Sequence, residues 1–460
     1  SSFITAQQNR AATVYSAAND GMLHAFDGAT GEERWAYIPS MVMSNLYKLA
    51  DNDYANIHQY YVDASPTVAD VYVPTGNGNN SAWKTILVGG LNAGGRGLYA
   101  LDVTDPANPK GLWEFSDNNM GYTFGNPIVT RLSTGEWVVI VSSGLNNVSP
   151  GDGIGRLYVL NASDGSIRHQ ISTGEGSTTT PSGLGKLNVW IENPLENKVD
   201  RVYGGDMLGN VWRFDVNDTI ANSGREAVKI AELNSNTAGT IKQPITTKPE
   251  LAKINNKFIV LVGTGRYLGA PDVNDTTVNS VYAFKDLSLS TGLGNLRAIT
   301  GANEMVKQTM VDGTFNSKPI RTISHNAMDW TTNSGWYVDL LSTGERVNVD
   351  MQLQYNTLTF AGNVPGNSNA CTVSGGFAWL YHIDINDGSY LATVTNPTQA
   401  GQRLDTNALV AGIKTIKLPT GRTVSIVTDT GGTIKAYDDP APTGSAAGTA
   451  KRTSWRELID

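Results

Sequence analysis

Cysteine is almost absent from this chain of 460 residues, in which Cys371 is the only one. A single cysteine excludes a disulfide bond within the chain and any zinc or iron–sulfur site built from several cysteines. Histidine is also scarce, and its five copies lie far apart in the sequence. We therefore expect each histidine to be a surface or core residue and not a metal ligand. Pairing of Cys371 with a cysteine outside this chain stays open.

Long apolar runs and basic clusters are missing as well. No stretch reaches the roughly 18 consecutive apolar residues of a membrane-spanning helix, so no transmembrane segment is expected. Residues 1–10 lack the basic region and the apolar core of a signal peptide, so none is expected there. Lysine and arginine number 34 against 42 acidic residues, which gives a formal net charge of −8 without a basic cluster. Nucleic acid is therefore not an expected partner.

Glycine, with 49 copies, marks a recurring hairpin pattern. Its clearest example covers residues 87–106, which read LVGGLNAGGRGLYALDVTDP. An apolar strand there meets a glycine-rich turn, and the second strand alternates apolar with small or polar residues before an Asp-Pro stop. Glycine permits positive φ in the turn, and Pro106 cannot donate a hydrogen bond to a strand ladder. The run therefore predicts a β-hairpin.

Seven such units follow one another along the chain. They cover residues 13–38, 65–115, 121–164, 201–215, 258–284, 335–384 and 423–437. This repetition predicts an all-β fold, a seven-bladed β-propeller of a modified type with long inter-strand insertions. Apolar spacing in 41–53 predicts one short helix as an insertion. We expect residues 1–460 to form a single domain, with a flexible stretch and C-terminal tail over 440–460.

Patterns that could indicate catalysis have simpler structural explanations here. No lysine follows the glycines of 87–106 at the spacing of a phosphate-binding loop, and their context is strand–turn–strand. No G-x-S-x-G nucleophile elbow occurs. The recurring tryptophans are expected to pack between blades. They are Trp35, Trp113, Trp137 and Trp212.

Several motifs in order along the chain carry a resemblance to a known family. They read NDGMLHAFDGATGEERWAYIP, GGLNAGGRGLYALDVTDP, MGYTFGNPIV, DRVYGGDMLGNVWRFDV, VGTGRYL and RTSWREL. Together they are similar to the C-terminal domain of the PilY/PilC family, whose members are associated with the tip of bacterial type IV pili. The resemblance covers nearly the whole chain.

This resemblance implies a function, a location and partners. It implies the C-terminal domain of a larger exported protein at the pilus tip and cell surface, associated with the outer membrane and with virulence. Such a protein promotes pilus biogenesis against retraction and supports adherence and twitching motility. The implied partners are minor pilins and the pilus assembly machinery, with the host-cell surface as a further partner.

The same resemblance implies calcium. The family carries a loop of the form Asp-x-Asn/Asp-x-Asp-x-x-x-Asp just before its Arg-x-Tyr-x-Gly-Asp strand. Here the acidic positions hold Glu192, Glu196 and Asp200, whereas Pro194 stands where the pattern has Asn or Asp and Lys198 adds a local positive charge. Calcium requires six to eight oxygen ligands, and Lys198 offers only its backbone carbonyl. Two alternatives stay open: a calcium site formed by Glu192, Glu196, Lys198 and Asp200, or a hairpin that keeps its turn without metal.

Three classes of function are therefore weighed. The first is a non-enzymatic pilus-tip protein regulated by calcium, and the second is an envelope assembly scaffold without an adhesive role. The third is a quinone-dependent dehydrogenase, because ATGEERWAY is similar to the tryptophan-bearing repeat of those enzymes. Many such enzymes use a pair of adjacent cysteines, which one cysteine cannot supply, so catalysis is not expected. The insertions 40–63, 177–200 and 287–330 are the expected contact loops, because binding usually involves loops on a rigid scaffold.

Overall fold

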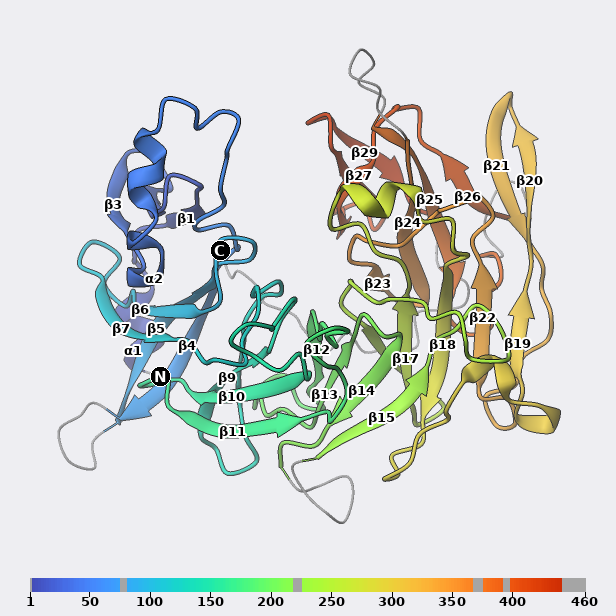
Figure 1. Ribbon diagram of the computed structural model, residues 1–460, viewed down its shortest axis with the longest axis horizontal. Coiled ribbons are helices and arrows are strands. Elements are labelled where there is room, and N and C mark those ends of the chain that lie inside the picture. Colours follow the sequence, from blue (N-terminus) through green and yellow to red (C-terminus); the bar gives the residue numbers. More distant parts are fainter. Residues whose placement is uncertain (1, 75–80, 218–225, 367–374, 392–397, 441–460) are drawn as a thin grey trace. The chain divides into compact units, whose positions relative to one another are not determined.

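The structure, a computed structural model, describes residues 2–74, 81–217, 226–366, 375–391 and 398–440 (Figure 1). Within these residues twenty-nine strands form seven sheets. The chain divides into two compact units. The first comprises 1–187, 191–202 and 214–227, and the second comprises 188–190, 203–213 and the residues from 228 onwards. Cys371 and nearly all of the predicted tail over 440–460 lie outside the described residues.

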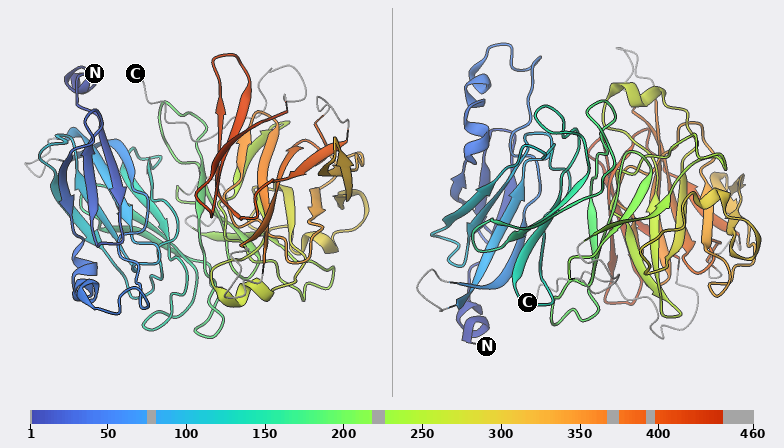
Figure 2. Two further views of the ribbon diagram at one scale, coloured as in Figure 1. Left: turned by 90° about the horizontal axis from the view of Figure 1, so that it is seen from above. Right: turned by 60° about the horizontal axis from the view of Figure 1, so that its bottom comes forward.

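The first unit contains three antiparallel sheets. The first sheet has the order β1-β2-β3, with β1 (Thr13–Ala17), β2 (Leu23–Asp27) and β3 (Glu33–Tyr37). The second has the order β4-β5-β6-β7, with β4 (Thr67–Pro74), β5 (Ser81–Gly90), β6 (Leu98–Asp102) and β7 (Lys110–Phe115). The third has the order β11-β10-β9-β8, with β8 (Ile128–Arg131), β9 (Trp137–Ser142), β10 (Arg156–Asn161) and β11 (Ile167–Ser172). In Figure 2 the strands of the first sheet (dark blue) lie beside those of the second (light blue).

Short helices occupy the start of the first unit and the connection between its first two sheets. They are α1 (Ser2–Gln7), α2 (Ser40–Met43) and the 3-10 helix η1 (Leu46–Ala50). The single helix predicted over 41–53 is therefore replaced by two short pieces. Ser44 and Asn45 separate them, and such side chains compete with the helical hydrogen bonds of the backbone. Among the helices of the described residues, none is long and apolar enough to cross a membrane.

Most of the fourth sheet, and all of the last three, belong to the second unit. The fourth sheet has the order β12-β13-β14-β15, with β12 (Leu187–Trp190), β13 (Arg201–Gly205), β14 (Asn210–Phe214) and β15 (Ala227–Glu232). The fifth has the order β16-β17-β18-β22-β19, with β16 (Glu250–Ile254), β17 (Lys257–Gly263), β18 (Ser280–Asp286), β19 (Met305–Gln308) and β22 (Gly335–Asp339).

The sixth sheet is the largest and has the order β20-β21-β26-β25-β24-β23. Its strands are β20 (Met310–Phe315), β21 (Lys318–Ile323), β23 (Gln352–Gln354), β24 (Thr357–Pro365), β25 (Gly376–Asp384) and β26 (Gln399–Arg403). The seventh has the order β27-β28-β29, with β27 (Val410–Lys417), β28 (Thr423–Asp429) and β29 (Ile434–Asp438). Three 3-10 helices complete the unit: η2 (Ala270–Asn274), η3 (Leu296–Ala298) and η4 (Gly301–Asn303).

Inner strands of these sheets are buried on both faces. On β5, Leu87 packs into a core shared with the first sheet, whereas Ile86 and Val88 pack into a core shared with the third. In the second unit Leu261 and Val262 of β17 divide in the same way between two cores. Successive residues of a strand point to opposite faces of its sheet. When another sheet packs against each face, the strand therefore needs apolar residues at every position. This explains why the central strands are continuous apolar runs.

The hairpin predicted over 87–106 is confirmed. Strands β5 and β6 pair antiparallel from Ile86 opposite Asp102 to Gly90 opposite Leu98. Its turn requires glycine because of close packing and not because of φ, since a Cβ at Gly94 would lie 1.8 Å from the carbonyl oxygen of Tyr61, whereas the left-handed residue of the turn is Asn92, with φ +47°. The backbone of the 40–63 insertion therefore packs directly against this turn.

The predicted composition of the sixth unit is wrong in one strand. Residues 335–340 were assigned to that unit, but β22 pairs antiparallel with β18, so it belongs to the fifth sheet. The insertion 287–330, expected to be a contact loop, contains β19, β20 and β21. The β20–β21 hairpin lies at the edge of the sixth sheet (Figure 1). Pairing over long sequence distances decided this arrangement, and spacing along the chain does not report it.

Candidate functional site

The predicted calcium loop connects β12 to β13 and closes on itself as a tight turn. The side chain of Asn193 accepts a hydrogen bond from the backbone N–H of Leu195 at 3.2 Å. The Asn193 carbonyl accepts from the N–H of Asn197, also at 3.2 Å. Asn197 has φ +49°, a left-handed conformation that asparagine tolerates better than most residues. The turn is therefore specified by its two asparagines.

The loop is also fixed to the end of β8. The N–H of Arg131 donates to the carbonyl of Asn197 at 2.9 Å, and the N–H of Val199 donates to the carbonyl of Arg131 at 2.8 Å. The Asn217 amide donates to the carbonyl of Val199 at 2.6 Å. Three backbone groups of the loop thus have protein partners. These contacts fix the loop to β8 and to Asn217 through groups of the protein itself.

Glu196 and Asp200 of the loop each form an ion pair with a neighbouring cation. Lys198 Nζ lies 3.1 Å from Glu196 Oε2, and Arg201 Nε lies 3.1 Å from Asp200 Oδ2. The hydrogen bond from Lys198 is the largest of the effects that hold the pKa of Glu196 below its ordinary value. Glu192 is exposed at the start of the loop. The loop therefore brings Glu196 and Lys198 together, and Asp200 pairs with a residue outside the predicted set.

This donor set does not fit a calcium ion in the conformation observed. Calcium needs six to eight oxygens, usually with several carboxylates converging. Among the described residues, no group of three acidic, histidine or cysteine side chains is arranged to hold a metal ion. Pro194 supplies no side-chain oxygen at a ligand position, and the ammonium group of Lys198 lies 3.1 Å from Glu196 Oε2, an oxygen that calcium would need. The calcium site formed by Glu192, Glu196, Lys198 and Asp200 stays a prediction.

The residues of the neighbouring Arg-x-Tyr-x-Gly-Asp motif have structural roles. Asp206 is fully buried and accepts four hydrogen bonds within its own hairpin, from the N–H groups of Leu208 and Asn210, the Asn210 amide and the Trp212 indole. One carboxylate thus satisfies the donors of a whole turn. The motif is explained by hairpin geometry, and no ligand is needed to account for it.

A buried ion pair in the second unit was not predicted from the sequence. Arg213 Nη1 lies 2.6 Å from Asp286 Oδ1, and both side chains are almost completely buried. The hydroxyl of Tyr203 donates to the other oxygen of Asp286 at 2.7 Å. Because these partners lie far apart along the chain, local patterns carry no signal for the pair.

Tryptophans connect successive sheets, which confirms their predicted structural role for Trp35 and Trp113. The indole of Trp35 donates to the carbonyl of Pro106 at 2.8 Å, and that of Trp113 donates to the carbonyl of Ala162 at 3.1 Å. A third such bond in the second unit runs from Trp336 to the carbonyl of Ile385 at 2.9 Å. Trp137 packs edge-on against a tryptophan of the second sheet. Trp212 differs, because its indole stays within its own hairpin.

The fold defined by these features is that of a β-propeller. Seven sheets follow one another along the chain, their inner strands are buried on both faces, and tryptophans connect neighbouring sheets. The seven sheets correspond to seven blades, as predicted.

Comparison with known proteins identifies the family. The model of the PilY1 β-propeller domain matches residues 1–318. A type IV pilus biogenesis factor PilY1 homologue of Xylella fastidiosa is 32% identical over 99% of this chain and 36% of its own length. The type IV pilus biogenesis factor PilY1 of Pseudomonas aeruginosa is 34% identical over 84% of this chain and 36% of its own length. The chain therefore belongs to the PilY1 β-propeller family, which confirms the predicted resemblance.

A solved structure agrees with this assignment. The crystal structure of the P. aeruginosa PilY1 C-terminal domain is similar with a TM-score of 0.71 and 28% sequence identity, covering 96% of this chain and 95% of that domain. The chain spans about a third of the length of the two curated relatives. The activity and partners of a whole protein are therefore a matter for proposal.

Proposed function

We propose that this chain is the propeller part of a type IV pilus biogenesis factor and that it acts by binding, not by catalysis. The observation that carries the proposal is the 32–34% identity to two such factors over most of this chain. The side chains of the motif residues Asp206, Trp35 and Trp113 all form structural hydrogen bonds. These motifs are therefore explained by the scaffold, which favours a binding role over a catalytic one. Membership of this family also weighs against the alternative of a quinone-dependent dehydrogenase.

In this proposal the propeller promotes pilus extension against retraction and thereby supports adherence and twitching motility. Minor pilins and the assembly machinery are its partners, the host-cell surface is a further one, and its place is the exported pilus tip. Exposed aromatic and aliphatic side chains of the 40–63 insertion support a contact role for that segment. They are Met43, Tyr47, Ile57 and Tyr60. An envelope scaffold without an adhesive role differs only in its partner.

A domain exchange in P. aeruginosa tests the proposal. The matching C-terminal part of its PilY1 is replaced by this chain, and surface pili, twitching and attachment to epithelial cells are measured. Restoration of pili and twitching supports the proposed role in biogenesis, and restored attachment supports the adhesive part. Restored pili without attachment supports the scaffold alternative. Absence of pili, although the chimera is exported at the native level, contradicts the proposal.

The calcium prediction belongs to this proposal as its regulatory part. The contacts of Lys198 and Arg201 favour the alternative in which the loop keeps its turn without metal. Titration of the metal-stripped protein with calcium distinguishes the two alternatives, and its expected result is given with the other predictions below.

A further inference from the structure

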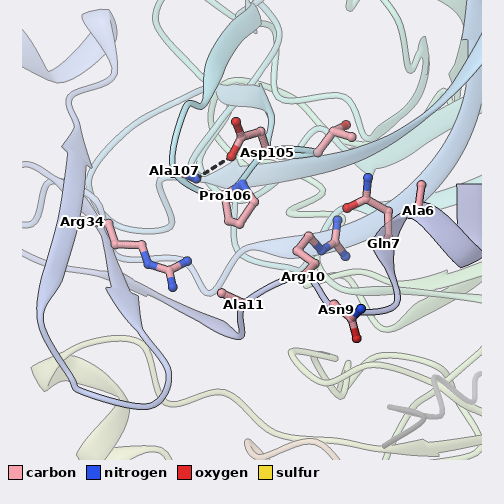
Figure 3. Close-up of a pocket in the computed structure, with 10 residues that line it drawn as sticks. Ala6, Gln7, Asn9, Arg10, Ala11, Arg34, Asp105, Pro106 and Ala107 are labelled. Atoms are coloured by element: carbon pink, nitrogen blue, oxygen red, sulfur yellow. Dashed lines mark hydrogen bonds between the residues drawn. The ribbon is translucent and has the colours of Figure 1, made fainter.

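A pocket of about 700 Å³ lies in the first unit, away from the calcium loop. It is formed by the end of α1, the segment leading to β1, a residue of β3 and the turn between β6 and β7 (Figure 3). Its volume is in the range of small-molecule and peptide sites. Its lining residues are Ala6, Gln7, Asn9, Arg10, Ala11, Arg34, Thr104, Asp105, Pro106 and Ala107.

Two arginines line this pocket, and they differ in their partners. Arg34 is neutralised, because its Nη2 lies 2.5 Å from Asp27 Oδ2 while its Nη1 donates to Thr13 at 2.6 Å. Arg10 has no carboxylate partner among the residues that the structure describes. Within the described part of the chain, its side chain donates one hydrogen bond, from Nη1 to the hydroxyl of Thr85 at 2.6 Å. The other N–H donors of its guanidinium have no hydrogen bond to a described residue and can bind a ligand.

The guanidinium of Arg10 is held in place by Thr85, which is itself fixed by further hydrogen bonds. Thr85 is buried, and its hydroxyl donates in turn to Asp70 Oδ1 at 2.6 Å. The N–H of Thr85 is bonded to the hydroxyl of Thr104, another residue of the pocket lining, at 3.0 Å. Arg10 is thus positioned before any ligand arrives, which reduces the entropy lost on binding.

The remaining walls match a polypeptide better than a compact anion. Alanine and proline side chains form small apolar surfaces, and the side-chain amides of Gln7 and Asn9 have no hydrogen bond to a described residue. In Figure 3 Gln7 lies beside Arg10, whereas Arg34 is on the other side of the pocket. Backbone amides of an extended peptide would find donors and acceptors in Gln7 and Asn9, and one carboxylate would match one free guanidinium.

A dianion such as phosphate fits less well. Asp105 contributes a negative charge to the lining, and its oxygens accept from the N–H of Ala107 at 3.0 Å and the amide of Asn108 at 2.9 Å. Since Asp27 balances Arg34, a second negative charge on the ligand would have no free cation.

We propose that this pocket binds an extended peptide through one carboxylate, which pairs with Arg10, while small residues of the peptide cover the alanine and proline walls. The carboxylate is either the C-terminus of a partner chain or an Asp or Glu side chain. The pocket is separate from the calcium loop, and the proposal does not depend on the pilus role.

Fluorescence polarisation with labelled peptides tests this proposal on the full chain. Three short alanine-rich peptides are compared: one with a free C-terminal carboxylate, its C-terminal amide, and an amide with one internal glutamate. We expect at least one carboxylate peptide to bind saturably and the amide without glutamate to bind at least about tenfold more weakly, because a charge-assisted arginine pair is lost. Which carboxylate peptide binds identifies the source.

Matched variants locate the binding. Arg10→Gln is expected to weaken binding of the carboxylate peptide at least about tenfold. Arg168→Gln makes the same substitution at an exposed position of the same unit that does not line the pocket, and is expected to leave the affinity unchanged. Ala11→Glu, at an exposed lining position, is expected to block the pocket if Arg10→Gln fails to fold.

Three outcomes overturn the proposal. One is that neither of the two carboxylate peptides binds saturably. Another is equal binding of the amide peptide that lacks glutamate. The last is equal loss in Arg10→Gln and Arg168→Gln, which would mean that only the general charge of the unit attracts the peptide.

Discussion

Acid should affect the stability of the second unit in opposite directions through two buried neighbours, His382 and Asp439. His382 Nε2 lies 3.7 Å from Asp439 Oδ1, and their side chains are 7% and 3% exposed. The other ring nitrogen of His382 is bonded to the Thr359 hydroxyl at 3.0 Å. Burial lowers the pKa of His382 to about 4 and raises the pKa of Asp439 to about 6. Burial therefore favours the neutral form of each group.

The sign of each contribution follows from linkage. The folded pKa of His382 lies below the unfolded value, so the unfolded chain binds more protons and stability falls as the pH drops from about 6.5 towards about 4. The folded pKa of Asp439 lies above the unfolded value, so stability rises as the pH drops from about 6 towards about 4. In the unmodified chain the two contributions largely offset each other.

Replacing one of the two residues makes the pH-dependent contribution of the other to stability measurable. For His382, the shift from the ordinary value of 6.5 to about 4 corresponds to a loss of about 2.5 kcal/mol between about pH 7.5 and pH 4.5. We expect this loss in Asp439→Asn when its free energy of urea unfolding is compared with that of the double variant that also carries His382→Asn. Groups that titrate elsewhere contribute equally to both variants and cancel.

A specific result would refute this reasoning. If His382 and Asp439 form a charged pair, the folded pKa of His382 is raised, and the advantage of the unmodified chain over His382→Asn grows on acidification. A difference between Asp439→Asn and the double variant that does not change with pH would likewise show that His382 does not have a lowered pKa.

The remaining predictions concern buried polar contacts and the calcium loop. Glu345→Ala leaves buried Arg321, which lies 2.6 Å from Glu345 Oε2, without its buried carboxylate, and should lower the free energy of unfolding by about 3–5 kcal/mol in urea; a loss below about 1 kcal/mol contradicts this. Trp336→Phe removes the indole bond to the buried strand end at Ile385 and should cost about 2 kcal/mol by the same measurement, whereas no change would make that bond incidental. Calcium should leave the melting temperature of the metal-stripped protein unchanged, because protein cations already pair with Glu196 and Asp200; a saturable rise that Asp200→Ala abolishes would instead establish the predicted site.

Local patterns were sufficient to identify most of the inner strands. The hairpin of β5 and β6 and the strand β17 lie where their apolar runs and glycine turns predict. Such strands are buried on both faces, so their hydrophobicity is continuous and their ends are marked by turn residues. The outer strand β11 was not identified, because most of its residues are exposed and its apolar signal is weak.

For the candidate site, spacing located the loop but not its chemistry. The sequence shows that Pro194 replaces a ligand and that Lys198 lies in the loop, but only the structure shows that Lys198 pairs with Glu196 and that Arg201 pairs with Asp200. The pairing of Arg213 with Asp286 was equally invisible, because contacts between distant segments follow from strand register and not from local composition.

The sequence by itself determined the all-β class, the number of repeated units and the family. Each of these follows from local periodicity and from short motifs, which depend only on residues within one hairpin. Only the tertiary structure decided that β22 joins the fifth sheet, that tryptophans bond to the next sheet, and that Arg10 lines a pocket without a carboxylate partner among the described residues. These features depend on which distant backbone and side-chain groups meet, and non-local pairing is set by packing of the whole fold.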